Sequence, residues 1–147
     1  MKLISHRGNT TGPTEEENHP DYIDHAIQQG YDVEIDIRIE SWGVFFLGHD
    51  NPDYEVTLEW LKKRSDSLWL HCKNIEALGW FNEQPHNFKY FWHQDDNYTI
   101  TSNRFIWTYP NKLLYYNSIC VLPELGYNGN INDCYAICSD YIDRYKD

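Results

Sequence analysis

The stretch that decides the fold is DVEIDIR, residues 32–38, in which polar and apolar side chains alternate. Because alternate residues on a strand point the same way, Glu34 and Asp36 should project from one face, with Cα atoms roughly 6.5 to 7 Å apart. Two neighbouring buried carboxylates are costly unless a cation or protons neutralise them. The pattern therefore predicts a cation site on this strand, and the alternative is an edge strand whose carboxylates face water. The opposite face is expected to lie under helices and carries Val33, Ile35 and Ile37.

Three further polar motifs lie at the ends of expected strands, or in the loops after them. They are His6-Arg7-Gly8, Glu17-Asn18 and Gly48-His49-Asp50. Histidine suits proton transfer because its ordinary pKa of about 6.5 makes both protonation states accessible near neutral pH. An arginine supplies positive charge for a phosphate group. Together with the two carboxylates, these motifs predict a metal-assisted phosphate site.

Strands and helices alternate through the first half of the chain. Eight strands are expected, at residues 2–6, 32–38, 44–47, 68–72, 88–92, 105–109, 118–122 and 135–139. Three helices are expected, at residues 20–29, 57–63 and 75–81. The segments between the later strands lack helical periodicity and are rich in turn-forming residues. We therefore expect an α/β fold, a reduced (β/α)8 TIM-type barrel whose later helices are shortened or lost, with an open or distorted barrel as the alternative.

Length and composition predict one domain, residues 1–147. The chain is well short of the roughly 250 residues of a full TIM barrel, so parts of that fold have to be missing. Aromatic residues make up 16% of the chain, and their large rings are expected to replace missing helices as cover. The four cysteines fall at or near strands and are expected to be buried free thiols.

The chain is strongly acidic, with 23 acidic and 12 basic residues and a formal net charge of −11. A field of this sign repels nucleic acids and anionic membrane surfaces, so neither is an expected partner. It also opposes a phosphate substrate unless a bound cation, Arg7 and Lys73 compensate locally. No run approaches the ~20 apolar residues of a membrane span, and the chain begins directly with a strand. We expect a cytoplasmic protein.

Residues 2–52 resemble the glycerophosphodiester phosphodiesterase family, which belongs to the phosphatidylinositol-specific phospholipase C-like phosphodiesterase superfamily. In that family His-Arg-Gly closes the first strand, Glu-Asn opens the first helix, Glu-x-Asp ends the second strand and His-Asp ends the third. Each of these motifs is present here in the same order. Leu70-His71-Cys72-Lys73 sits where the family's fourth strand carries Glu-x-Lys, so His71 replaces a metal-binding glutamate. The resemblance implies a short, divergent member of the family.

The activity that the resemblance implies is metal-dependent hydrolysis of a glycerophosphodiester or a similar small phosphodiester, as in lipid metabolism. His6 and His49 would then be the catalytic acid and base on either side of the phosphate. The implied cation is Mg²⁺ or Ca²⁺, held by Glu34, Asp36 and His71. The imidazole is a softer ligand than the glutamate it replaces, so the change from glutamate to His71 affects which metal binds and how tightly.

The phosphate would be bound by Arg7 and Lys73. Supporting roles are assigned to a set of polar residues that a helix N-terminus or a solvated loop would explain as well; they are Glu17, Asp50, His93 and Glu124. The alternative function is a non-catalytic phosphate-ligand or metal-binding module on the same barrel. Loss of substrate-covering loops and the change to His71 favour that alternative.

Overall fold

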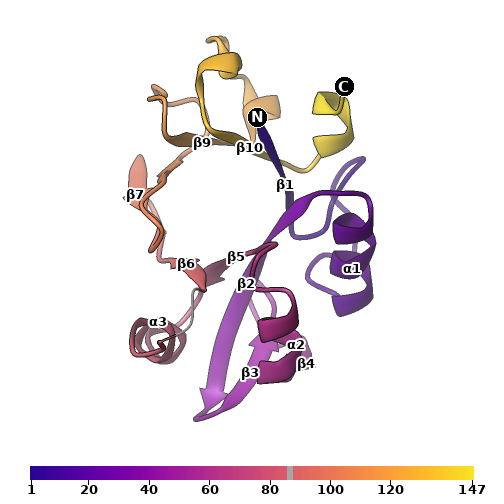
Figure 1. Ribbon diagram of the computed structural model, residues 1–147, viewed down its shortest axis with the longest axis vertical. Coiled ribbons are helices and arrows are strands. Elements are labelled where there is room, and N and C mark those ends of the chain that lie inside the picture. The colour runs from indigo at the N-terminus through magenta and orange to yellow at the C-terminus, as the bar shows by residue number, and fades with distance from the viewer. Residues whose placement is uncertain (86–87) are drawn as a thin grey trace.

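The chain builds one mixed sheet of ten strands, seen here in a computed structural model that describes residues 1–85 and 88–147 (Figure 1). The strands are β1 (Lys2–His6), β2 (Asp32–Ser41), β3 (Val44–Leu47), β4 (Tyr54–Val56), β5 (Leu68–Cys72), β6 (Lys89–Phe91), β7 (Tyr98–Ile100), β8 (Ile106–Thr108), β9 (Ser118–Val121) and β10 (Ala136–Ser139). Seven of them form a parallel series in the order β6-β5-β2-β1-β10-β9-β8. The other three pair antiparallel: β3 pairs with the second half of β2, β4 pairs with β3, and β7 pairs with β8. All eight predicted strands are present.

Three α-helices pack outside the first half of this sheet. They are α1 (Pro20–Gln28), α2 (Leu58–Lys63) and α3 (Ile75–Asn82). Each begins at a side chain that accepts a hydrogen bond from a backbone N–H of the first turn, and these caps are His19, Thr57 and Asn74. From residue 88 onward the helices are short 3-10 helices, η1 (Pro123–Leu125), η2 (Ile131–Asp133) and η3 (Ile142–Tyr145). Among the helices of the described residues, none combines the length and apolar character needed to cross a bilayer.

Strand β2 is the centre of the fold because it pairs with three other strands. Its first half pairs parallel with β1 and β5, and its second half pairs antiparallel with β3. As predicted, Val33, Ile35 and Ile37 share one face and are fully buried in the core beneath the helices. Each such side chain contributes roughly 1.5 to 3 kcal/mol by leaving water. The cysteines are also buried and free, as expected.

The predicted TIM-type barrel is wrong, because the sheet is mixed and curves into a half-barrel with few helices. Only Trp42 and Gly43 separate β2 from β3, and so short a connection can form only an antiparallel hairpin. Strand β7, which was not predicted, pairs antiparallel with β8. In the described part of the chain, no strand ladder joins β6 to β7; side-chain and loop hydrogen bonds such as Thr99 Oγ1 to the Trp92 carbonyl link these margins instead.

The inner face of the curved sheet has two layers. The layer farther from the carboxyl ends of the parallel strands is apolar and includes Ile4, Trp69, Phe91 and Trp107. Side chains on one face of a strand recur every second residue, so the next inward position lies two residues further along each strand or just beyond its end. In these four strands that position is polar. Those positions are His6, His71, His93 and Tyr109. The pleat therefore collects polar side chains at the carboxyl ends of the parallel strands.

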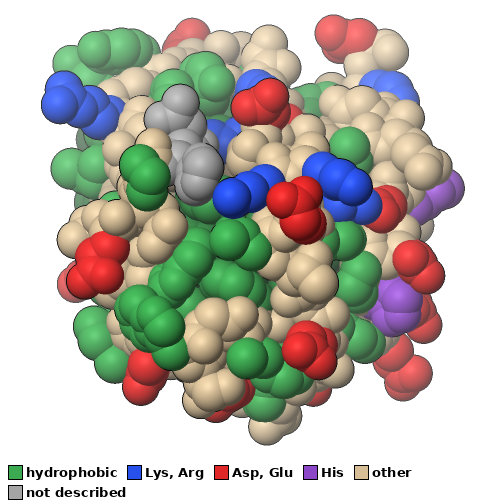
Figure 2. Space-filling view, turned by 60° about the horizontal axis from the view of Figure 1, so that its bottom comes forward, with side chains coloured by type: hydrophobic (Ala, Val, Ile, Leu, Met, Phe, Trp, Pro, Cys, Tyr) green, Lys and Arg blue, Asp and Glu red, His purple; other side chains and the backbone are tan. Residues whose placement is uncertain are grey.

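The negative charge of the chain is not gathered on the face that Figure 2 shows. Hydrophobic side chains occupy the middle of that face, and acidic side chains are scattered around them among polar and basic ones. This arrangement contrasts with the interior of the half-barrel, where buried carboxylates stand close together.

Candidate functional site

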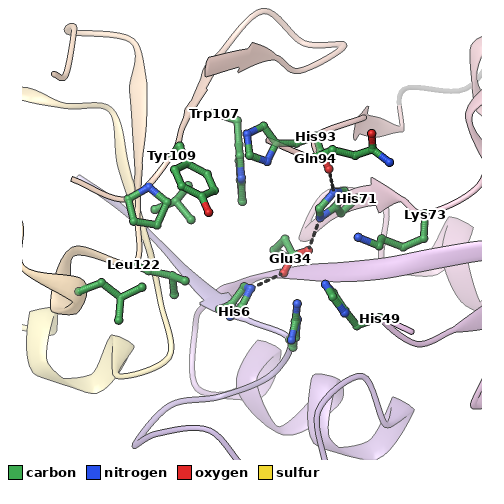
Figure 3. A pocket seen from close by; sticks show the side chains of 14 residues that line it. His6, Glu34, His49, His71, Lys73, His93, Gln94, Trp107, Tyr109 and Leu122 are labelled. Atoms are coloured by element: carbon green, nitrogen blue, oxygen red, sulfur yellow. Dashed lines mark hydrogen bonds and ion pairs between the residues drawn. The ribbon is translucent and has the colours of Figure 1, made fainter. Parts of the chain in front are cut away.

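A pocket of about 410 Å³ opens at the carboxyl ends of the parallel strands (Figure 3). Sites for small molecules are commonly 300 to 1,000 Å³ in volume. One side, which we name the charged wall, comprises His6, Arg7, Glu34 and His71, with His49 and Lys73 at its margin. The opposite side, which we name the apolar wall, comprises Trp107, Tyr109, Val121, Leu122 and Leu125. The pocket thus joins a polar site to an apolar surface.

The charged wall centres on three groups that converge as metal ligands do. Glu34 and Asp36 are only 1% and 0% exposed, which excludes the alternative of an edge strand facing water. His71 Nδ1 lies 3.5 Å from Glu34 Oε1 and 3.5 Å from Asp36 Oδ1. No described group donates a hydrogen bond to either Glu34 oxygen or to Asp36 Oδ1. Buried carboxylate oxygens without donors are costly, so the site calls for a cation or protons.

The ring of His71 is held so that its free nitrogen faces the carboxylates. Its Nε2 lies 3.0 Å from the backbone carbonyl of His93, which accepts only, so Nε2 must carry the proton. In the neutral ring the Nδ1 lone pair then points toward Glu34 and Asp36. The ring also stacks on Phe91, with centroids 4.8 Å apart. A histidine oriented by a backbone carbonyl through its other nitrogen is the usual arrangement of a metal ligand.

The three ligand atoms fit one divalent cation. They all lie within 4.8 Å of one another. Ligand atoms around one small cation are roughly 3 to 4 Å apart, so a slight contraction of this group would close around the ion. A cation would also neutralise two carboxylates that otherwise repel each other. The residues present therefore fit one divalent cation, and their geometry does not distinguish Mg²⁺ or Ca²⁺ from other divalent metals.

Asp36 is also tied to residues of the first loop. The Asn18 amide donates to Asp36 Oδ2 at 2.9 Å, and Asn18 Oδ1 accepts from the Asp36 backbone N–H at 3.0 Å. Arg7 Nε lies 3.0 Å from Asp36 Oδ2, an ion pair without hydrogen-bond alignment. Burial raises the pKa of Asp36, but Arg7, His71 and the Asn18 bond together lower it below its ordinary value. Asp36 is therefore held as a carboxylate, and Arg7 is partly engaged by it.

His6 forms a second ordered group on the same wall. Its Nδ1 lies 2.7 Å from Asp140 Oδ1, and its Nε2 lies 3.5 Å from Glu34 Oε2. Burial lowers the pKa of His6, but the charge of Glu34 and the bond to Asp140 outweigh it and raise the pKa above 6.5. Burial likewise raises the pKa of Asp140, and its contacts with His6 and Asn9 bring it below the ordinary value. Asp140 thus fixes the ring so that Nε2 faces the pocket.

Two of the residues predicted to support the site, Glu124 and Glu17, form hydrogen bonds outside the main pocket. Glu124 accepts hydrogen bonds from the Asp140 backbone N–H and from Ser139 Oγ, both at 2.9 Å. Glu17 accepts from the Asn9 amide at 3.1 Å, and Asn9 also donates to Asp140 Oδ1 at 2.9 Å. Neither carboxylate lines the main pocket. Their contacts position Asp140 and the loop after β1 rather than reach a ligand.

The remaining predicted residues lie around the rim. His49 lines the pocket, but its side chain is 43% exposed and its Nδ1 bonds the exposed Asp50 at 2.7 Å. In the view of Figure 3 the rings of His6 and His49 lie on either side of the Glu34 carboxylate. Lys73 and His93 also line the pocket. The structure therefore brings together all three predicted metal ligands, both predicted catalytic histidines and both predicted cationic residues.

Two glycines of the motifs are required by close packing. Gly8 has a φ of +93°, and a Cβ there would lie 2.5 Å from the ring of Tyr22. Gly48 has a φ of +151°, and a Cβ there would lie 1.9 Å from the Asn51 carbonyl oxygen. Side chains are disfavoured at both positions for this reason. The glycines thus allow the chain to place the neighbouring Arg7 and His49 at the pocket.

Sequence reasoning missed the roles of Asp140 and of the apolar wall. Nothing local in the sequence indicates that Asp140, the residue after the last strand, bonds a histidine 134 positions earlier. The apolar wall had one local signal, since Trp107 and Tyr109 share the inward face of β8 and the residue after it. Asn18 belongs to a predicted motif, yet its bonds to Asp36 were not foreseen.

Comparison with known proteins found no match among family models, curated proteins or solved structures. The case for a function therefore rests on the arrangement of side chains in this pocket.

Proposed function

We propose that the protein is a metal-dependent phosphodiesterase that hydrolyses a small phosphodiester. The observation that carries the proposal is the convergence of Glu34, Asp36 and His71 beside the ordered His6–Asp140 pair, where Glu34, His71 and His6 line one pocket. Structural ion pairs explain neither the donor-free oxygens of Glu34 nor the orientation of the His71 lone pair. A cation together with a proton-transferring histidine is a set of groups that can catalyse phosphodiester hydrolysis.

The cation belongs to this proposal too. The sequence resemblance implies Mg²⁺ or Ca²⁺, whereas an imidazole nitrogen in the ligand set favours Mn²⁺ or Zn²⁺. The proposal requires only that one divalent cation is held by Glu34, Asp36 and His71. When bound, it supplies positive charge for the phosphate oxygens and for activation of the nucleophile.

Proton transfer is assigned by where the two histidines lie. His49, the more exposed one, accepts a proton from the attacking water. The new P–O bond forms from that water while the P–O bond to one alcohol breaks. His6, the more enclosed one, gives the proton on Nε2 to the departing alkoxide, and Asp140 holds the ring in place. Lys73 and the part of Arg7 not engaged by Asp36 contact the phosphate oxygens.

A second candidate function is a non-catalytic module that binds a phosphate ligand or a metal. It is favoured by the exposure of His49, whose partner Asp50 is itself 83% exposed, so among the described residues no buried side chain bonds the ring of this base. Under this alternative the cation and the phosphate bind, and no ester bond breaks.

Hydrolysis of glycerophosphodiesters followed by ³¹P NMR tests the proposal, because the signals of diester and monoester are separate. With Mg²⁺, Ca²⁺, Mn²⁺ or Zn²⁺ added, the protein should convert diester to monoester, and His6→Ala should lose at least roughly a hundredfold in rate. Hydrolysis that is unchanged in His6→Ala would contradict the mechanism. Binding of cation and diester with no conversion under any of the four cations would select the second candidate function.

A further inference from the structure

The apolar wall lies in the same pocket as the charged wall, so a ligand bound at the charged wall also meets it. Its members come from β8, β9, η1 and the residues that directly follow β8 and β9, and they face the ligand groups of β1, β2 and β5 (Figure 3). In the view of Figure 3, Leu122 lies on the same side of Glu34 as His6 does. An alcohol that departs beside His6 would therefore be directed toward the apolar wall.

The other end of the site has the opposite character. A second cavity of about 250 Å³ shares Arg7 and His49 with the main pocket. Four carboxylates line this second cavity, and they are Glu15, Glu17, Asp50 and Asp53. An apolar group placed there would strip water from charged groups without replacing its hydrogen bonds. A phosphodiester with two different alcohol groups would thus bind in one direction.

We propose that the substrate is an amphiphilic phosphodiester, whose departing alcohol carries an alkyl group that packs on the apolar wall. This inference rests on the proposed function, because that function places the phosphate at the charged wall. Trp107, Tyr109, Leu122 and Leu125 are its specificity-determining residues. Contact of the alkyl chain with these side chains removes apolar surface from water, and each buried methylene should raise affinity roughly fourfold.

The apolar wall is also connected to His6 through η1. Leu122 and Leu125 flank Glu124, whose carboxylate holds the backbone of Asp140 and the hydroxyl of Ser139. Leu122 has left-handed backbone angles, with φ at 48° and ψ at 57°, which are unusual for a branched side chain. The same short segment thus supports both the contact with the alkyl group and the partner of His6.

Isothermal titration of four phosphonates tests the inference without requiring turnover. The probes are the methyl, butyl, hexyl and glyceryl monoesters of methylphosphonic acid, each with one negative charge as in a phosphodiester, titrated in the presence of Mn²⁺. Affinity should rise from methyl to butyl by roughly fourfold for each methylene buried, and the hexyl ester should bind at least about tenfold more tightly than the glyceryl ester. Equal affinities for the hexyl and glyceryl esters would overturn the inference.

Two exposed leucines provide a matched pair of variants that should fold normally. Leu125 is 63% exposed and lines the pocket, whereas Leu113 is 83% exposed and does not. Leu125→Asp should weaken binding of the hexyl ester roughly threefold to tenfold and bring it nearer to the glyceryl ester, while Leu113→Asp should change neither. Equal effects of the two substitutions would contradict the apolar wall.

The same titrations separate this inference from the proposed function. If no diester is hydrolysed but the hexyl ester still binds more tightly and depends on Leu125, the function is wrong and the apolar subsite stands. If diesters are hydrolysed but alkyl length has no effect, the function stands and the subsite is wrong. If no diester is hydrolysed and none of the four esters binds, both are wrong.

Discussion

The two walls of the pocket are built in different ways. The charged wall rises from β1, β2 and β5, which have the three α-helices and the larger apolar core behind them. The apolar wall rises from β8, β9 and η1, which are covered by loops and short 3-10 helices. Charged groups act through direction and distance, so they need a rigid support, whereas apolar contact has no preferred direction. The difference teaches that, in this small fold, α-helices and the larger core support the groups that must be placed most accurately.

The largest effect should come from the centre of the charged wall. Glu34→Gln keeps the shape of the side chain but removes its charge, so the cation should be lost and kcat/KM should fall roughly a thousandfold. The melting temperature measured in EDTA should not fall, because the amide no longer repels the carboxylate of Asp36.

Glu55→Gln is the matched control for this substitution, since Glu55 is exposed on β4. It should leave both kcat/KM and the melting temperature unchanged. If Glu34→Gln instead unfolds the protein in EDTA and leaves the activity of the folded fraction intact, Glu34 is structural and the comparison of the two walls fails.

A smaller effect is expected at Asp140, which positions His6 without reaching a ligand. Asp140 contributes to the raised pKa of His6, so Asp140→Asn should move the titration of the His6 ring to lower pH and reduce kcat roughly tenfold to a hundredfold. The ring can be followed by NMR in the absence of metal. An unchanged His6 titration would contradict the assigned role.

The smallest effect should be a change of metal preference at His71. His71→Glu replaces the nitrogen ligand by an oxygen, so the ratio of the Kd for Mg²⁺ to the Kd for Mn²⁺ should fall roughly tenfold. Isothermal titration of each cation gives both constants, and His25→Glu provides a charge-matched control away from the site. If the ratio is the same in both variants, His71 is not a ligand.

Features that depend on neighbouring residues in the sequence could be predicted, whereas features that depend on contacts between residues far apart in the sequence could not. The alternation in residues 32–38 is local, and it correctly placed Glu34 and Asp36 on one face and their apolar neighbours on the other. The eight expected strands were found for the same reason. The pairing of β1 with β10 joins the two ends of the chain, and no local pattern indicates it. The contact between His6 and Asp140 depends on that pairing, so its role could not be predicted.

The error in fold class has a physical cause that was visible in the sequence, namely the short connection between β2 and β3. The two residues between β2 and β3 allow only a hairpin, so the expected third barrel strand lies outside the parallel series. Strand β7 escaped prediction because it has only three residues, two of them exposed. The convergence of the site survived this error because β2 is long enough for the hairpin to return His49 to the pocket.

The central claim is that Glu34, Asp36 and His71 hold one divalent cation. Anomalous X-ray diffraction from a crystal grown with Mn²⁺ tests it directly, because the signal locates manganese without assumptions about the ligands. The account predicts one strong peak in direct contact with Glu34, Asp36 and His71 Nδ1, at ligand distances of about 2.0 to 2.3 Å. A crystal that shows manganese elsewhere, and none between these three side chains, would contradict it.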